Sequence, residues 1–169
     1  MLDSISEARL TPINPTLANR VRQMASVLGF DIRVTRGAAS ADEQMAYYAQ
    51  GRLPVSTVNI LRGKVKLAPL TEDQNVKVTD APPGHSWHEY LFAVDVVPMT
   101  PVPDYNENHP TWRKILEVAP QFQLTDGVHW KDEPHLQPIE LPDSPTPVYV
   151  GMLHTVTMEE IWRYAGLAA

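Results

Sequence analysis

One apolar segment with a carboxylate at its centre constrains this chain more than any other feature. Residues 92–97 read Phe-Ala-Val-Asp-Val-Val, so five apolar residues surround Asp95. Such a run indicates a strand in the protein core, and a buried carboxylate without a partner is energetically costly. Asp95 therefore needs a cation, a metal ion or several hydrogen-bond donors nearby. From the residues alone, a metal site and a salt bridge to an arginine such as Arg36 are equally good explanations.

Two histidines stand at positions that suit a metal site with Asp95. His88 precedes Asp95 by seven residues, and His135 closes a later acidic stretch that begins at Asp132. A catalytic zinc commonly takes two imidazoles and one carboxylate, keeps a fourth position for water, and works with a further carboxylate as general base. Each residue alone is weak evidence, because a lone histidine is more often a hydrogen-bonded structural residue. His129 is a rival candidate ligand near the same turn as His135.

Length and composition limit the classes of function. The chain has 169 residues, a formal net charge of −6 and no cysteine, so disulfides and thiolate metal sites are excluded. Nucleic-acid binding is not expected, because it depends on Lys and Arg that neutralise phosphates. Membrane insertion is not expected either, since no apolar run approaches the length that spans a bilayer. The first residues lack a secretory signal, so we expect synthesis in the cytoplasm. We also expect a monomer.

Hydrophobic periodicity and capping signals predict an α+β domain. Helices are expected at residues 15–28, 41–50, 110–119 and 157–166. Strands are expected at residues 30–35, 76–79, 92–97, 123–130 and 135–139, and the last two should pair in antiparallel fashion. Residues 52–75, which carry the basic residues Arg62, Lys64 and Lys66, are expected to form a long loop. This order predicts one domain over residues 1–169, with a small central antiparallel sheet and flanking helices.

The stretch that ends at Asp95 resembles the first zinc motif of a known metallopeptidase family. From Thr79 it runs Thr-x-Ala-x-x-Gly, then Ser-x-His, six residues and Asp. The second motif of the family, an acidic residue three positions before a histidine, is matched from Asp132 to His135, with Pro134 directly before the histidine. This family comprises the zinc D-Ala-D-Ala carboxypeptidases and L-alanyl-D-glutamate endopeptidases (LAS-type metallopeptidases), as in phage endolysins and vancomycin-resistance D,D-peptidases.

The resemblance implies a fold, a metal and a role for each matched residue. The fold would be that of the hedgehog and D,D-peptidase domains, with a motif-bearing core at about residues 15–140 and a C-terminal extension that carries the closing helix. One catalytic Zn²⁺ would be held by His88, Asp95 and His135. Asp132 would be the general base that takes a proton from water and passes it to the departing amine.

The substrate-binding residues of the family are matched less completely. Ser86 matches the serine that contacts substrate, Gln44 lies in a segment similar to the family's N-terminal helix signature, and Trp130 is expected to line the pocket. Family members usually carry an arginine directly before the serine that opens this helix, but the present chain has Ala39 there. Arg36, three residues earlier, is the candidate to supply the guanidinium.

Two further departures lie between the two ligands of the first motif. Leu91 stands where a small residue is common, and Glu89 stands where a polar uncharged residue is common. These changes leave the metal ligands intact and affect the expected substrate preference.

The resemblance implies an enzyme, a zinc metallopeptidase whose partner is the peptidoglycan stem peptide. Because no leader is visible, we expect an endolysin-like L-alanyl-D-glutamate endopeptidase of a bacteriophage, which acts on the cell wall after release. A D-Ala-D-Ala carboxypeptidase or dipeptidase is the alternative, since a cytoplasmic dipeptidase also needs no leader. An alternative of another class is a zinc-bearing binding or virion structural domain without catalysis.

Overall fold

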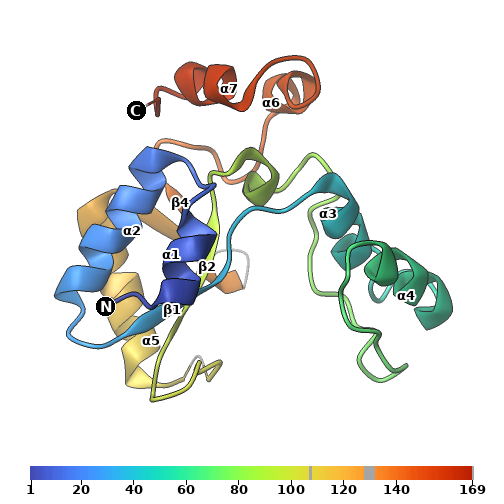
Figure 1. Ribbon diagram of the computed structural model, residues 1–169, viewed down its shortest axis with the longest axis horizontal. Coiled ribbons are helices and arrows are strands. Elements are labelled where there is room, and N and C mark those ends of the chain that lie inside the picture. Colours follow the sequence, from blue (N-terminus) through green and yellow to red (C-terminus); the bar gives the residue numbers. More distant parts are fainter. Residues whose placement is uncertain (107, 128–131, 169) are drawn as a thin grey trace.

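A four-stranded antiparallel sheet forms the centre of the computed structural model, which describes residues 1–106, 108–127 and 132–168 (Figure 1). Its strand order is β1-β2-β4-β3. The strands are β1 (Ile32–Arg36), β2 (Val94–Pro98), β3 (Leu124–Gly127) and β4 (Asp132–Pro138). β3 and β4 pair in antiparallel fashion, as the sequence predicts. The α+β class with a small antiparallel sheet is therefore confirmed.

Helices flank this sheet or project away from it within the described ranges. They are α1 (Ser4–Leu10), α2 (Pro15–Val27), α3 (Ala41–Tyr48), α4 (Val55–Lys64), α5 (Pro110–Val118), α6 (Pro147–Met152) and α7 (Met158–Tyr164), with 3-10 helices η1 (Trp87–Tyr90) and η2 (Ala119–Phe122). α2 and α3 begin at the predicted residues and α7 begins one residue later. The side chains of Asn14, Ser40 and Thr157 cap these helices, because each accepts a hydrogen bond from the first turn.

The prediction of a loop at residues 52–75 is wrong, because α4 lies within this range and packs against α3. α4 has no side-chain cap and contains Gly63, so its sequence carries few local helix signals and packing decides its structure. Arg62 is buried and donates from Nε to the Ala68 carbonyl at 2.7 Å, so it is not part of an exposed basic patch. Residues 76–79, which were expected to be a strand, have no regular secondary structure and no strand partner among the described residues.

One face of the sheet carries the main hydrophobic core. Val94, Val96 and Leu136 are buried there against the apolar sides of α2 and α5. Because neighbouring side chains in a strand point to opposite faces, Asp95 and His135 lie on the other face of the sheet.

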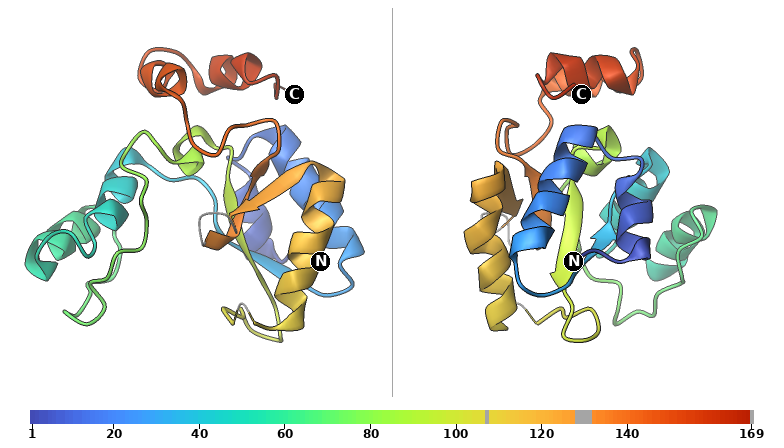
Figure 2. Two further views of the ribbon diagram at one scale, coloured as in Figure 1. Left: turned by 180° about the vertical axis from the view of Figure 1, so that it is seen from behind. Right: turned by 60° about the vertical axis from the view of Figure 1, so that its left-hand side comes forward.

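A second apolar cluster joins the first metal-motif segment to the C-terminal segment. Its members from both segments are buried and include Trp87, Tyr90, Phe92, Leu141, Tyr149, Ile161 and Leu167. In addition, Trp162 Nε1 donates a hydrogen bond to the Tyr90 carbonyl at 3.1 Å. Two views of the chain show α6 and α7 lying across one end of the molecule while α3 and α4 project from its side (Figure 2). Among the described residues, every helix is too short or too polar to cross a lipid bilayer.

Asn14 ties three distant parts of the chain together. Its side chain is fully buried, caps α2 through a hydrogen bond from the Leu17 amide at 3.1 Å, and donates to the Leu167 carbonyl at 2.9 Å. Its backbone amide donates to the Leu91 carbonyl at 3.0 Å. The start of α2, the first motif and the C-terminal segment therefore meet at this residue.

We expect Asn14→Ala to lower the free energy of unfolding by about 2–4 kcal/mol, because it removes a helix cap and leaves a buried carbonyl without its amide donor. Urea denaturation followed by circular dichroism measures this change. Asn19→Ala, at an exposed position of the same helix, is the matched control and should change stability little. Equal stability of the two variants would contradict the role given to Asn14.

Candidate metal centre

The fold brings three residues from two distant motifs together. Asp95 lies in β2, and His135 lies directly opposite it in the neighbouring strand β4. His88 reaches the same point from η1, the short helix that precedes β2. One ligand atom of each residue lies within 4.8 Å of the other two, so this group could hold a metal ion.

The distances within the group suit a small tetrahedral cation. Asp95 Oδ1 lies 3.1 Å from His88 Nε2 and 3.6 Å from His135 Nδ1. Zinc binds nitrogen and oxygen at about 2.0–2.2 Å, so tetrahedral ligand atoms should be roughly 3.3–3.5 Å apart. The two imidazole rings are inclined by 82° to each other. Only small shifts would therefore place all three ligand atoms around one ion.

The backbone of the loop after β1 fixes the orientation of His88. His88 Nδ1 lies 2.7 Å from the Gly37 carbonyl, which can only accept, so Nδ1 carries the hydrogen. In a neutral imidazole, Nε2 then presents a lone pair toward the Asp95 carboxylate, an arrangement that needs a cation or a proton between the two atoms. Metal-bound histidines commonly donate their other N–H to a carbonyl in this way. A second hydrogen bond joins the same loop to η1, because the Ala39 amide donates to the His88 carbonyl at 3.1 Å.

The electrostatic environment keeps Asp95 ionised. Burial alone would raise the pKa of the Asp95 carboxyl, but the charge and hydrogen bonds of the His88 and His135 imidazoles outweigh burial and hold this pKa well below its usual range. The salt bridge from Asp95 to Arg36 is not found. Instead, Arg36 Nη2 donates to Gln44 Oε1 at 3.1 Å, and its guanidinium lies over the Tyr47 ring.

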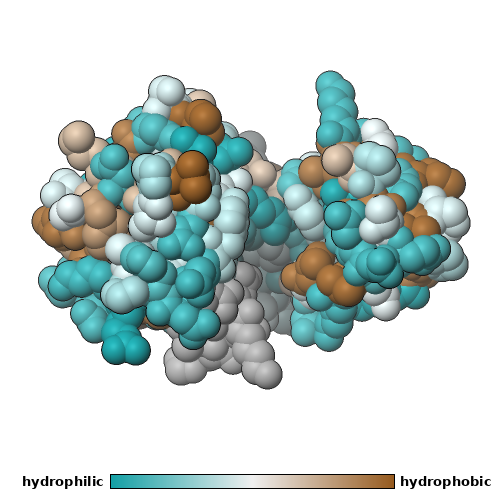
Figure 3. Space-filling view, turned by 90° about the horizontal axis from the view of Figure 1, so that it is seen from below, coloured by the Kyte–Doolittle hydropathy of each residue, from teal (hydrophilic) through white to brown (hydrophobic). Residues whose placement is uncertain are grey.

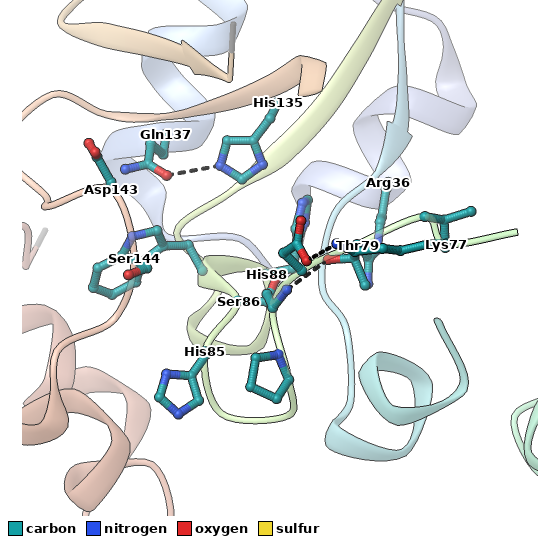
Figure 4. A pocket seen from close by; sticks show the side chains of 15 residues that line it. Arg36, Lys77, Thr79, His85, Ser86, His88, His135, Gln137, Asp143 and Ser144 are labelled. Atoms are coloured by element: carbon teal, nitrogen blue, oxygen red, sulfur yellow. Dashed lines mark hydrogen bonds and ion pairs between the residues drawn. The ribbon is translucent and has the colours of Figure 1, made fainter. Parts of the chain in front are cut away.

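A pocket of about 740 Å³ opens beside the three residues. Its walls include residues 77–82, residues 85–88, and Asp143 and Ser144 from the segment after β4. In the close view, Asp143 and Ser144 lie across the pocket from Arg36 (Figure 4). Seen from below, the surface is hollowed between the sheet-bearing body and the α3–α4 pair (Figure 3).

The structure places the predicted substrate-binding residues unequally. Ser86 and Arg36 both line the pocket. Gln44 does not line it but supports its wall, because its buried amide accepts from Arg36 and donates to the Ala81 carbonyl at 2.7 Å. Trp130 lies outside the described residues, so its place in the pocket stays a prediction.

The predicted base and the rival ligand cannot be placed by their side chains. The backbone of Asp132 begins β4 and pairs with Gly127, but its side chain lies outside the described part of the chain. His129 also lies outside the described residues. The role of Asp132 as general base therefore stays a prediction.

Several pocket residues were missed by the sequence analysis. They are Lys77, His85, Gln137, Asp143 and Ser144. Gln137 could have been identified, because it follows His135 by two residues and so shares its strand face. The other four lie in irregular segments, where no periodicity reports the direction of a side chain.

Backbone geometry explains why a small residue is common at the position of Leu91, and hydrogen bonding explains the carboxylate at Glu89. Leu91 has φ 61°, the left-handed region in which glycine is least strained, so a small residue is favoured at this position. Glu89 is buried and accepts hydrogen bonds from the amides of Gly84 and Ser86. Burial raises the pKa of Glu89, and these two amides partly offset the rise. Glu89 thus shapes the turn that carries Ser86.

Comparisons with known proteins agree with the resemblance in the two motifs. The chain is 29% identical over 142 residues to the peptidoglycan L-alanyl-D-glutamate endopeptidase CwlK of Bacillus subtilis (strain 168), a match that covers 77% of this chain and 74% of that protein. No protein-family model matches the chain.

Two solved structures share the fold. One is the L-Ala D-Glu endopeptidase ChiX of Serratia marcescens, with a TM-score of 0.52 and 19% identity over 81% of this chain and 89% of that chain. The other is a mutant of the vancomycin resistance D,D-pentapeptidase VanY in complex with Zn(II), with a TM-score of 0.51 and 16% identity over 88% of this chain and 82% of that chain.

We expect Gly37→Ala to weaken metal binding, because an added Cβ would lie 2.7 Å from the Arg9 carbonyl oxygen and force the loop away from His88. Loss of an outer-shell contact of this kind typically costs about 10- to 100-fold in metal affinity. Isothermal titration of the metal-free protein with Zn²⁺ measures the change. Gly63→Ala, where an added Cβ meets no atom within 4 Å, is the control and should bind as the natural chain does.

Proposed function

We propose that the chain is a zinc peptidase that cleaves the peptidoglycan stem peptide, on the premise that it shares the fold of the two solved peptidases and that its two motifs resemble those of the zinc D-Ala-D-Ala carboxypeptidases and L-alanyl-D-glutamate endopeptidases. The observation that carries this proposal is the group of His88, Asp95 and His135, two of which, His88 and His135, line a pocket. A purely structural virion domain would not need an open pocket beside such a group.

The three residues would hold one Zn²⁺ at the sheet face. When bound, the ion would polarise the scissile carbonyl and make a water molecule more acidic. Asp132 would take the proton of the attacking water and deliver it to the departing amine. Its place at the start of β4, three residues before His135, supports this role.

Arg36 supplies a fixed positive charge to the same pocket. Its guanidinium is held by Gln44, by Glu43 at 3.8 Å and by the face of Tyr47, so its position is determined before substrate arrives. A guanidinium in this position suits a substrate carboxylate or a carbonyl oxygen that gains charge. Arg36 would thus replace the arginine that the family usually carries at the position of Ala39.

We favour cleavage of the L-alanyl-D-glutamate bond. The similar protein CwlK is named for this activity, and its match covers 77% of the present chain. The D-Ala-D-Ala carboxypeptidase reaction is the second candidate, because the cationic wall at Arg36 also suits a terminal carboxylate. For either reaction the substrate lies in the cell wall. We propose that the protein reaches the wall after release from the cytoplasm, as an endolysin does.

Mass spectrometry of peptidoglycan fragments after digestion distinguishes the two reactions. Cleavage by an L-alanyl-D-glutamate endopeptidase should expose a new amino group on glutamate, whereas a carboxypeptidase should release free D-alanine. Peptidoglycan that stays intact with the zinc-loaded protein would contradict both and favour a binding domain.

We expect Asp132→Asn to lower kcat by about 10²–10⁴-fold while Zn²⁺ binding is kept, because it removes only the proton acceptor. Turnover of a stem peptide and zinc content measure the two effects. His88→Ala should lose both metal and turnover. Glu133→Gln is the adjacent acidic control and should keep activity; an Asp132→Asn enzyme with unchanged kcat would refute the assigned base.

We expect Arg36→Gln to raise KM for a stem peptide by about tenfold or more, because a charge-assisted hydrogen bond to substrate is lost. Arg22→Gln removes an arginine that pairs with Glu7 on the far surface of α2 and should leave KM unchanged. Steady-state kinetics of both variants provides the measurement. Equal KM values would show that Arg36 does not contact substrate.

A further inference from the structure

Gln137 lies beside the candidate metal ligands without being one of them. It follows His135 by two residues in β4, is fully buried and lines the pocket. In the close view its side chain and that of His135 point toward one another (Figure 4). We propose that Gln137 is a positioning residue that fixes the tautomer of His135, so that Nδ1 is the atom offered to the metal.

The orientation of the Gln137 amide is determined by Pro142. Gln137 Nε2 lies 3.0 Å from the Pro142 carbonyl, which can only accept a hydrogen bond. The amide nitrogen must therefore face Pro142, and the amide oxygen must face the imidazole. A reversed amide would set two oxygens against each other.

This orientation sets the protonation of the imidazole. Gln137 Oε1 lies 2.9 Å from His135 Nε2, and because this oxygen only accepts, Nε2 must carry the hydrogen. A neutral imidazole has one N–H, so Nδ1 is then the unprotonated nitrogen. Nδ1 is also the atom nearest the Asp95 carboxylate, at 3.6 Å. Gln137 thus does for His135 what the Gly37 carbonyl does for His88.

The Pro142 carbonyl is itself held from the other motif. It accepts a second hydrogen bond from Trp87 Nε1 at 2.9 Å, and Trp87 directly precedes His88. One backbone oxygen in the segment that follows β4 is therefore connected to both histidines. It reaches His135 through Gln137, and it reaches His88 through the neighbouring residue Trp87. If Gln137 loses its amide, this carbonyl still has the indole donor, so the main loss should fall on His135.

This inference rests on the proposed metal site but not on the proposed peptidase activity. Zn²⁺ binding by the metal-free protein therefore tests it separately from the function. A protein that binds Zn²⁺ with the expected dependence on Gln137 would support the inference even if stem peptides stayed intact.

Titration of the metal-free full chain with Zn²⁺ compares three variants. Gln137→Met keeps the length of the side chain but removes the acceptor, and should weaken Zn²⁺ binding about 10- to 100-fold. Gln137→Glu keeps an acceptor for His135 Nε2 but sets a carboxylate oxygen against the Pro142 carbonyl, so it should bind Zn²⁺ more weakly than the natural chain and more tightly than Gln137→Met. Gln121→Met, at an exposed position of η2, is the matched control and should bind unchanged.

Two results would overturn the proposal. One is Gln137→Met binding Zn²⁺ as tightly as the natural chain. The other is Gln137→Glu binding as weakly as Gln137→Met, which would show that the bond to Pro142 matters and the acceptor does not. Nitrogen-15 NMR of the His135 ring in the natural chain gives a test that needs no variant: Nε2 should be protonated with and without Zn²⁺, and an unprotonated Nε2 would also refute the inference.

Discussion

The contact of one carboxylate with two imidazoles organises this molecule. Asp95 stands in an interior strand of the sheet, where its charge would be costly without His88 and His135 beside it. The sheet face that bears this group cannot be closed by apolar packing, and the pocket opens there. The opposite face is free to carry the main core. A single polar group thus divides the sheet into a packing side and a chemical side.

The backbone contributes as much to the site as the side chains do. The Gly37 carbonyl accepts a hydrogen bond directly from His88. The Pro142 carbonyl accepts one from Gln137, which in turn contacts His135. β1 carries one extra residue at Thr35, so that Arg36 rather than Thr35 lies opposite Asp95. A bulge beside a site commonly redirects a side chain, and here it accompanies an arginine on the pocket wall.

The elements with strong local signals could be predicted, and those made by tertiary packing could not. The apolar run around Asp95 and the cap at Asn14 were sufficient to place β2 and the start of α2. α4 was missed because it lacks a side-chain cap and depends on α3. For the site, the motifs brought out His88 and His135, because spacing and flanking residues are local properties.

The remaining parts of the pocket could not be predicted for the same physical reason. Asp143 and Ser144 enter it only because the segment after β4 folds back over η1. No pattern in the sequence reports such a long-range contact. Arg36 was a candidate only by its charge, since the bulge that brings it opposite Asp95 has no sequence signal.

The packing of the C-terminal segment has a consequence for the order in which the molecule is built. Trp87, Tyr90 and Phe92 lie beneath Tyr149, Ile161 and Leu167, and Trp87 binds the Pro142 carbonyl. His88, Asp95 and His135 can come together through η1, β2 and β4 before the segment after β4 docks. Three aromatic side chains are exposed until then, and the centre becomes rigid only when that segment covers them.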